Sequence, residues 1–328
     1  MKGRYHFRVK SKRVLFEFTI RRNITVIKGD SATGKTTLLH MLYEYLRVGR
    51  ESGYQVSADG DYYVYLRREV GRDWREAMDS LTDTVIFIEE NNNFVFTKEF
   101  AEFVKKSGNY FVLVNRSPLR MLPYSIHEVY EIVTEGKHAD VKESYHRFKE
   151  LYSNYPVTGN NKMQNILTED SNSGFQFFSR LFRNRSVTSM GGNSNVISGI
   201  RKAHSKDVLV IVDGAAFGAM AEVCMEYAEA QHEQRISIWM PESFEYLILV
   251  SGLIQTEKLT QILENPSDYV ESREYESWEQ YFTQLLTSLT KGKISEYSKT
   301  ALNEYYTQDK NRDRIVGKFP EPIRSRLL

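Results

Sequence analysis

The stretch that decides the fold of the first half of the chain is ITVIKGDSATGKTTLLHML, residues 24–42. A short apolar run leads into a glycine-rich turn, and an apolar pattern with helical spacing follows Gly34, Lys35 and Thr36. The spacing G-x-x-x-x-G-K-[ST] between a strand and a helix is typical of a phosphate-binding loop. The backbone N–H groups and the helix N-terminus attract an anion, the lysine reaches the β- and γ-phosphates, and the threonine hydroxyl binds Mg²⁺. We therefore expect the nucleotide to contact Gly29, Asp30, Ser31, Ala32, Thr33, Gly34, Lys35, Thr36 and Thr37.

An acidic element is expected on a neighbouring strand, and TVIFIEENN, residues 84–92, supplies it. Its unbroken apolar run predicts a strand that is buried on both faces. Glu89 and Glu90 follow at the carboxyl end, where ligands bind in open α/β sheets. We expect Glu89 to hold Mg²⁺, directly or through water, and Glu90 to polarise the attacking water as a catalytic residue. The alternative is a solvated strand end without chemistry.

A further buried strand is predicted by YFVLVNRSP, residues 110–118, and it ends at Asn115 and Arg116. A polar side chain at this position can sense the γ-phosphate of a bound nucleotide. The alternative is a loop cap before Pro118. Strands around 126–133 are expected to close the domain.

The composition indicates a globular chain with room for two domains, since it has 328 residues and 41% hydrophobic residues. The formal net charge of +1 gives no global field for nucleic acid, so any basic site must be local. The single cysteine, Cys224, excludes an intramolecular disulfide and a Cys-based zinc site. The sequence contains no run of about 18 apolar residues, so no membrane-spanning helix is predicted. We expect a cytoplasmic protein with no membrane partner.

The second half of the chain alternates predicted strands and helices, which indicates a parallel sheet. Glu169 ends the strand in MQNILTED, and Asp213 ends the strand in DVLVIVDGAAFG. Both carboxylates are expected at the carboxyl edge of one sheet, where they can share a divalent cation. The alternative is structural, because Glu169 and Asp170 can belong to the N-cap region of the following helix.

The first half resembles the ATPase domains of the ABC and AAA-type P-loop families, through ITVIKGDSATGKTTLL, TVIFIEE and YFVLVNRS. It has no LSGGQ-like signature and no terminal histidine switch after YFVLV, so a reduced P-loop NTPase is expected rather than a transporter-type ATP sandwich. No guanine-reading N-K-x-D stands in a suitable place, which favours ATP.

Residues 163–255 resemble the Toprim domain of topoisomerases, primases and OLD-family nucleases, through ILTED, SMGGNSNV and VLVIVDGAAF. The resemblance implies that a glutamate and an Asp-x-Asp pair hold Mg²⁺ or Mn²⁺ for phosphodiester cleavage. Glu169 and Asp213 match this pattern as catalytic and metal-binding residues, whereas Ala215 stands in place of the second aspartate. Three other acids could compensate: Asp170, Glu242 and Glu245.

An ATPase joined to a Toprim-like domain resembles OLD-family nucleases and related anti-phage defence proteins. The resemblance implies that the nucleotide state gates a nucleic-acid-cleaving domain. Two alternatives stay open. One is a nucleotide-controlled interaction or sensor protein with a degenerate Toprim-like domain, and the other is a P-loop small-molecule kinase.

Nucleic acid, DNA or RNA, is the expected partner, because residues 171–206 contain no acidic residue. A basic stripe beside the two carboxylates would suit a phosphate backbone, although solvated helix and strand faces are the alternative. The stretch contains six basic residues: Arg180, Arg183, Arg185, Arg201, Lys202 and Lys206. Self-association, or a partner protein, is a further expectation from the resemblance.

The expected fold class is α/β, with an N-terminal P-loop NTPase sheet, a Toprim-like parallel-sheet domain and a helical tail. An amphipathic helix is predicted for Val141–Tyr152, in the linker, and another for Trp278–Leu289. The predicted segments are 1–135 for the NTPase domain, 136–162 for the linker, 163–255 for the Toprim-like domain and 256–328 for the helical extension.

Overall fold

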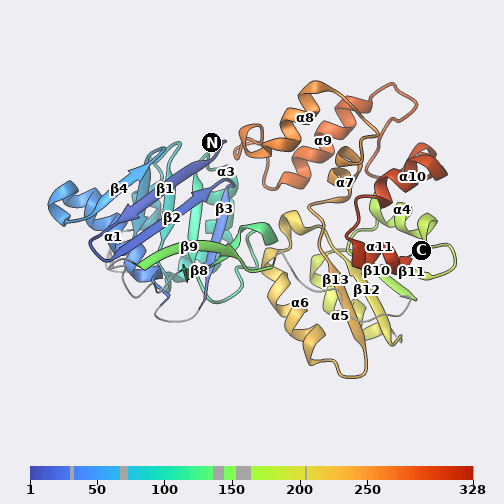
Figure 1. Cartoon of the computed structure of the whole chain (residues 1–328), viewed down its shortest axis with the longest axis horizontal. Coiled ribbons are helices and arrows are strands. Elements are labelled where there is room, and N and C mark those ends of the chain that lie inside the picture. Colours follow the sequence, from blue (N-terminus) through green and yellow to red (C-terminus); the bar gives the residue numbers. More distant parts are fainter. Residues whose placement is uncertain (30–32, 67–72, 136–143, 153–163, 204, 328) are drawn as a thin grey trace. The chain divides into compact units, whose positions relative to one another are not determined.

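The computed structural model describes residues 1–29, 33–66, 73–135, 144–152, 164–203 and 205–327 (Figure 1). The chain forms two compact units. The first unit is Met1–Leu151 together with Asn265–Glu276, and the second is Tyr152–Glu264 together with Ser277–Leu328. The boundary between Leu151 and Tyr152 lies within the predicted linker, residues 136–162. The first unit also contains a segment from the C-terminal half of the chain. No helix among the described residues is long and apolar enough to cross a lipid bilayer.

The first unit is built on a mixed nine-stranded sheet of order β4-β1-β2-β9-β8-β3-β7-β6-β5. Five neighbouring strands, from β8 to β5, run parallel, and β1 pairs antiparallel with β2 and β4. The strands are β1 (Tyr5–Lys10), β2 (Val14–Ile20), β3 (Ile24–Lys28), β4 (Gln55–Ala58), β5 (Tyr62–Tyr65), β6 (Val85–Ile88), β7 (Tyr110–Val114), β8 (Val129–Glu135) and β9 (Ser144–Glu150).

The strand that carries the acidic element is not a neighbour of the strand before the glycine-rich loop. β7 lies between β3 and β6, so the expectation of adjacent strands is wrong. Because all three strands are parallel, their carboxyl ends still meet at one edge of the sheet. Residues that follow β3, β6 and β7 therefore face a common site.

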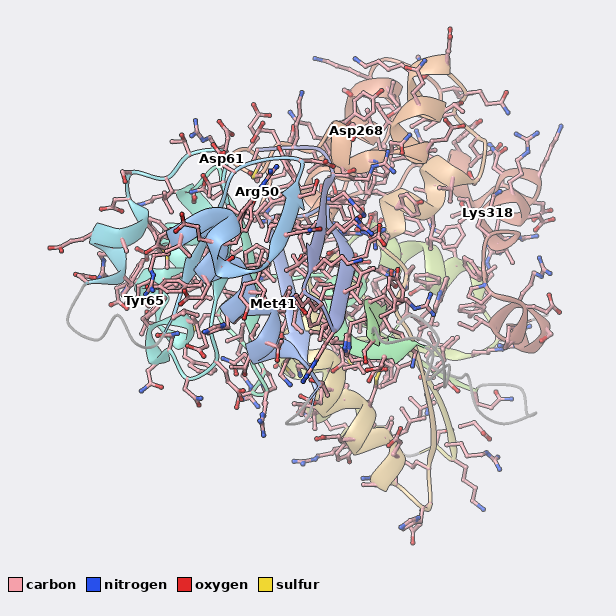
Figure 2. The ribbon with its side chains drawn as sticks, turned by 60° about the vertical axis from the view of Figure 1, so that its left-hand side comes forward. Met41, Arg50, Asp61, Tyr65, Asp268 and Lys318 are labelled. Atoms are coloured by element: carbon pink, nitrogen blue, oxygen red, sulfur yellow. The ribbon has the colours of Figure 1, made fainter. Side chains whose placement is uncertain are left out.

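The helix α1 (Lys35–Val48) covers the sheet with Leu38, Leu39, Met41 and Leu42, which are buried. Met41 is labelled in Figure 2, together with Tyr65, which ends β5. The other helical segments of this unit are η1 (Gly49–Ser52), α2 (Trp74–Met78), η3 (Asn93–Phe96), α3 (Lys98–Lys106), η4 (Ile126–Glu128) and η7 (Pro266–Asp268).

The helix predicted for Val141–Tyr152 is wrong for residues 144–150, which form β9. The strand is parallel to β2 and antiparallel to β8. Its aromatic residues Tyr145 and Phe148 have a spacing that also fits a helix. Tertiary structure decided the outcome, because hydrogen-bond ladders on both sides and stacking of Phe148 on Phe18, at 4.2 Å between ring centres, exist only in the strand.

The second unit contains a four-stranded sheet of order β11-β10-β12-β13, in which every neighbouring pair is parallel. The predicted parallel sheet is therefore confirmed, and the chain as a whole is α/β. The strands are β10 (Asn165–Thr168), β11 (Ser186–Ser189), β12 (Asp207–Ile211) and β13 (Arg235–Trp239).

Helices of the second unit alternate with these strands and continue to the C-terminus (Figure 1). The amphipathic helix predicted for Trp278–Leu289 is confirmed as α9, which buries Trp278, Phe282 and Leu286. The helical segments are α4 (Ser173–Leu181), η5 (Asn193–Asn195), α5 (Val196–Lys202), η6 (Gly214–Ala216), α6 (Gly218–Ala230), α7 (Phe244–Val250), α8 (Glu257–Glu264), α9 (Trp278–Thr290), η8 (Glu304–Thr307), α10 (Asp309–Val316) and α11 (Glu321–Leu327).

Candidate functional site

The glycine-rich loop joins β3 to α1, and its lysine is held over the loop backbone. Lys35 Nζ donates to the Gly29 carbonyl at 2.6 Å and to Thr33 Oγ1 at 3.0 Å. These contacts place the ammonium group where the N-terminus of α1 would bind an anion. Three of the residues predicted to bind nucleotide, Asp30, Ser31 and Ala32, lie outside the described residues.

Glycine is required at the turn into α1. Gly34 has φ +97°, a conformation that L side chains rarely adopt. A Cβ atom there would also lie 3.2 Å from the ring of Phe16. Any other residue at this position would therefore strain the backbone and crowd the ring of Phe16.

A cavity of about 490 Å³ joins the loop to the ends of the parallel strands. Lys35 and Thr36 line it from α1, Glu90 from the end of β6 and Arg116 from the end of β7. Arg116 Nε lies 2.8 Å from Glu90 Oε1. The remaining lining residues are Val14, Phe16, Thr33, Gly34, Thr37 and His146. The structure thus brings Glu90 to the glycine-rich loop, as the sequence predicts.

Glu89, the predicted metal ligand, is not among the residues that line this cavity. Its backbone N–H donates to the Tyr65 carbonyl at 3.1 Å, and its own carbonyl accepts from Asn92 Nδ2 at 2.7 Å. Asn115 is buried, and its Oδ1 accepts from the Ser117 N–H at 3.0 Å, which is the contact expected of a loop cap.

Sequence reasoning missed three of the residues that line this cavity, Val14, Phe16 and His146, which carry no local signal. Arg116 stands at the strand end where a polar side chain was expected to sense the γ-phosphate. The rings of Phe16 and His146 stack with centres 4.8 Å apart. Burial lowers the pKa of His146, which favours the neutral ring at pH 7. Recognising His146 would have required knowing that β9 pairs with β2.

A second cavity, of about 590 Å³, adjoins the first and shares Val14, Thr36 and Thr37 with it. The rings of His40 and Tyr54 meet edge to face beside it, with centres 6.4 Å apart. The other residues that line it are Ser11, Lys12, Arg13, Met41 and Gly53.

In the second unit, Glu169 follows β10 and Asp213 follows β12 one residue after Val212. Since these strands are parallel neighbours, the two residues meet at the carboxyl edge. The Asp213 backbone N–H hydrogen-bonds to the Glu169 carboxylate, and the Glu169 N–H donates to the Ile211 carbonyl at 2.9 Å. Gly192, in a left-handed turn, donates its N–H to the Glu169 carbonyl at 2.8 Å. The predicted acidic pair is therefore brought together.

Carboxylates from two helices crowd this pair. Burial raises the pKa of Glu169 to about 7, and the charges of Glu279 and Asp170 add to this rise. Burial also raises the pKa of Asp213 well above its usual range, with Glu279, Glu245 and Glu169 contributing. The physical cause is the same in both cases, because several negative charges share a partly desolvated volume.

Lys299 partly neutralises the negative charge of these carboxylates. Lys299 Nζ donates to Glu279 Oε1 at 2.6 Å and lies 3.0 Å from Glu245 Oε1. Tyr297 OH also donates to Glu245 Oε1 at 2.6 Å. Glu245 is fully buried, and its Oε2 has no hydrogen-bond partner among the described residues. We call Glu169, Asp213, Glu245, Glu279 and Lys299 the carboxylate cluster.

Sequence reasoning missed Glu279, Tyr297 and Lys299, because they lie in the helical extension that was assigned to packing. It named Glu245 as a possible replacement for the absent second aspartate, and the structure places Glu245 in the carboxylate cluster. Ala215 is buried with 2% exposure, and its N–H donates to the Glu242 carbonyl at 3.0 Å.

Asp170 serves the structure of α4. Its Oδ1 accepts from the Phe175 N–H at 2.9 Å, and the Asn172 N–H also bonds to this carboxylate. These contacts satisfy N–H groups at the start of the helix, as the structural alternative predicts for this residue.

The described residues contain no group of three or more His, Cys, Asp or Glu side chains placed to hold a metal ion. Glu169 and Asp213 supply two adjacent carboxylates, and Lys299 supplies a positive charge close to them. Oxygen ligands of this kind suit Mg²⁺ or Mn²⁺. Glu169 and Asp213 are thus a partial ligand set for such an ion, and the described residues do not complete it.

The basic stretch does not lie beside Glu169 and Asp213, contrary to expectation. Arg180, Arg183 and Arg185 lie between the last turn of α4 and the start of β11, and Arg201, Lys202 and Lys206 lie between the last turn of α5 and the start of β12. In a parallel sheet the connections from helix to strand lie at the amino edge, about 15 Å from the carboxyl edge for strands of this length. The second unit is therefore acidic at one edge and basic at the other.

No protein-family model matches this chain, and no curated protein shows significant similarity to it.

Proposed function

We propose that the first unit binds and hydrolyses ATP. The observation that carries this proposal is the cavity in which Lys35 and Thr36 meet Glu90 and Arg116. A phosphate-binding loop alone would only bind a nucleotide. A carboxylate and a guanidinium facing the same volume supply the groups that hydrolysis of the γ-phosphate needs.

The residues at the start of α1 would bind the phosphates and the metal ion. Lys35 and the N–H groups at the start of α1 bind the β- and γ-phosphates. The Thr36 hydroxyl is exposed at the cavity and would bind Mg²⁺ together with the phosphates, with Glu89 as the predicted carboxylate near it. Bound Mg²⁺ supplies charge neutralisation on the phosphates.

Glu90 orients and deprotonates the attacking water, and Arg116 stabilises the negative charge that develops on the γ-phosphate. In the structure the two side chains form an ion pair. Binding of a triphosphate offers Arg116 a second anion, so Glu90 is released toward the water. The adjoining cavity, lined by His40 and Tyr54, would receive the nucleobase.

The test is steady-state release of phosphate from ATP by the purified chain. Lys35→Ala is expected to abolish activity through loss of phosphate binding. Glu90→Gln is expected to keep ATP binding and lower turnover by about 10² or more. Lys98→Ala is the matched control, because its side chain is 80% exposed on α3. Full activity of Glu90→Gln would contradict the role of Glu90, and ADP release only with an added acceptor would indicate a kinase.

We propose for the second unit metal-dependent cleavage of nucleic acid, gated by the nucleotide state of the first unit. The observation that favours it is the adjacency of Glu169 and Asp213 within the carboxylate cluster. A divalent cation bound there would polarise the scissile phosphate and lower the pKa of a bound water. Glu169 and Asp213 would hold the cation, and the resemblance to OLD-family nucleases and related anti-phage defence proteins suggests a role in anti-phage defence for a cytoplasmic protein.

The alternative for this unit is a sensor or interaction function without catalysis. Ala215 and the bridging Lys299 favour it, because one carboxylate is absent and an ammonium group already neutralises two others.

Cleavage of mixed DNA and RNA with Mn²⁺ and with Mg²⁺ separates the two proposals. If the second unit is a nuclease, Asp213→Asn abolishes cleavage, whereas Glu229→Gln, at an exposed position on α6, does not. In the second case ATP is hydrolysed and nucleic acid stays intact.

A further inference from the structure

A basic cavity lies at the amino edge of the second unit, away from the carboxylate cluster. Its volume is about 560 Å³. Three arginines of RLFRNR, residues 180–185, reach it from the end of α4, and Arg312 reaches it from α10. The other lining residues are Gln164, Phe177, Leu181, Phe182, Asn184, Thr307 and Asp309.

The arginines are positioned by packing and by hydrogen bonds. Phe182 is buried and stacks on Phe178, and the guanidinium of Arg185 lies 5.6 Å from the centre of the Phe182 ring. The turn closes with a hydrogen bond from the Arg185 N–H to the Phe182 carbonyl at 2.9 Å. Arg180 Nη1 lies 3.5 Å from Thr307 Oγ1.

The charges of this cavity are unbalanced. Arg312 is neutralised by Asp309 and Asp313, at 2.7 and 2.8 Å. Within the described part of the chain, neither Arg180 nor Arg183 forms a salt bridge with a carboxylate. Guanidinium groups stay charged at all physiological pH values, so the cavity concentrates positive charge. An anion would relieve the repulsion between them.

The donors suit a phosphoryl group. Guanidinium groups bind phosphate oxygens in a bidentate manner, and Asn184 and Gln164 offer amide donors for the remaining oxygens. The volume exceeds that of a single ion and falls within the range of small-molecule sites. Phe177 and Phe182 are buried behind these donors, so the accessible wall of the cavity is mainly polar.

We propose that this cavity binds a terminal phosphate monoester carried by a nucleotide, either free or at the end of a nucleic acid chain. The site is separate from the carboxylate cluster, since Gln164 precedes β10 and Glu169 follows it. Its occupant is therefore bound and not cleaved at this position. The proposal does not depend on ATP hydrolysis or on nuclease activity.

The test uses fluorescence anisotropy in EDTA, with Lys35→Ala in every protein so that the glycine-rich loop does not contribute. The probes are a 5′-phosphorylated oligonucleotide and the same oligonucleotide with a 5′-hydroxyl, each labelled at the 3′ end. The phosphorylated probe is expected to bind at least about tenfold more tightly, because a charge-assisted hydrogen bond contributes this much.

Arg180→Gln/Arg183→Gln is expected to remove this preference. Arg201→Gln/Lys202→Gln is the matched control, since it removes two exposed charges from the same edge. The single variant Arg183→Gln, at an exposed position, keeps the test valid if the double variant does not fold. Equal binding of both probes, or an equal loss in both double variants, would overturn the proposal.

Competition with AMP identifies the source of the phosphate. Displacement of the phosphorylated probe by AMP supports a free nucleotide as the ligand. A retained preference without displacement supports the end of a nucleic acid chain.

Discussion

At the scale of the residue, Gly34 shows how one atom limits the site. The left-handed backbone and the ring of Phe16 each disfavour a Cβ atom at this position. Gly49, at the end of α1, also has a positive φ of +62°, but nothing lies within 4 Å of its Cβ position. A substitution at Gly49 would therefore test backbone strain alone, whereas one at Gly34 would combine strain with a steric conflict.

Gly34→Ala is expected to lower the free energy of unfolding by about 2 kcal/mol and to abolish ATP binding, because strain and the contact with Phe16 combine. Gly49→Ala is expected to cost about 1 kcal/mol through backbone strain and to leave ATP binding intact. Urea unfolding and ATP titration measure both effects. Normal ATP affinity in Gly34→Ala would show that the loop can adjust.

Glu169 has a raised pKa, and the sign of its effect on stability follows from linkage. Its pKa is about 7 in the folded chain and near 4.5 when unperturbed. Below pH 4.5 the carboxyl is protonated in both states, and between these values only the folded state holds the proton. The free energy of unfolding therefore falls as pH rises from 4.5 through 7 and levels off above this range.

Glu169→Gln is expected to remove this part of the pH dependence, which is about 3 kcal/mol. Asp213, Glu279, Asp170 and Lys299 face Glu169 and remain in the variant. Urea unfolding at pH 5, 6, 7 and 8 in EDTA gives the comparison. Identical slopes for the wild type and the variant would show that Glu169 is not protonated in the folded chain near neutral pH.

At the scale of the element, the segment between α9 and η8 carries Tyr297 and Lys299 into the carboxylate cluster. Glu245 stands at the start of α7 and is fully buried, so its charge depends on these two partners. The helical extension is therefore part of the site and not only a cover for the sheet. The apolar spacing of α9 correctly predicted that Phe282 and Leu286 pack in the core, but it gave no indication of the role of Glu279.

Lys299→Met is expected to destabilise the chain by about 3 kcal/mol, because it leaves a buried carboxylate without its cation. Lys299→Met/Glu245→Gln is expected to recover much of this loss, since the remaining side chain is neutral. Thermal or urea unfolding of the two variants in EDTA measures the difference. Equal instability of both would show that packing, and not charge, decides the effect.

At the scale of the whole molecule, residues 265–276 return from the C-terminal half to the first unit. Ser272 Oγ donates to the Gly108 carbonyl at 3.0 Å, and Asn23 Nδ2 donates to the Glu276 carbonyl at 2.9 Å. Lys105 forms an ion pair with Glu276. The first unit is therefore incomplete without a segment that lies more than a hundred residues away in the chain.

A truncated chain of residues 1–152 is expected to unfold at a lower temperature than the first unit does in the full chain. A peptide of residues 265–276, added in excess, is expected to raise its Tm, because a ligand that binds only the folded state stabilises it. A peptide with the same composition in scrambled order is the control. No difference between the peptides would show that the segment does not contribute to folding of the first unit.

The sequence by itself determined several elements of both halves and the positions of the acids that follow their strands. The glycine-rich loop, the buried strands and the acids after Ile88, Thr168 and Val212 are readable because backbone conformation and burial follow from short-range patterns. The parallel sheet of the second half follows from the alternation of strands and helices.

Only the tertiary structure decided which distant residues meet. The place of β7 between β3 and β6, and the strand β9 in place of a helix, depend on pairings between elements far apart in sequence. The same holds for Arg116 and His146 at the cavity, and for Glu279 and Lys299 in the carboxylate cluster. The basic stretch shows the same limit. Its charge is plain in the sequence, but the direction of the parallel strands sends it to the edge opposite the acids, because helix-to-strand connections return to the amino ends.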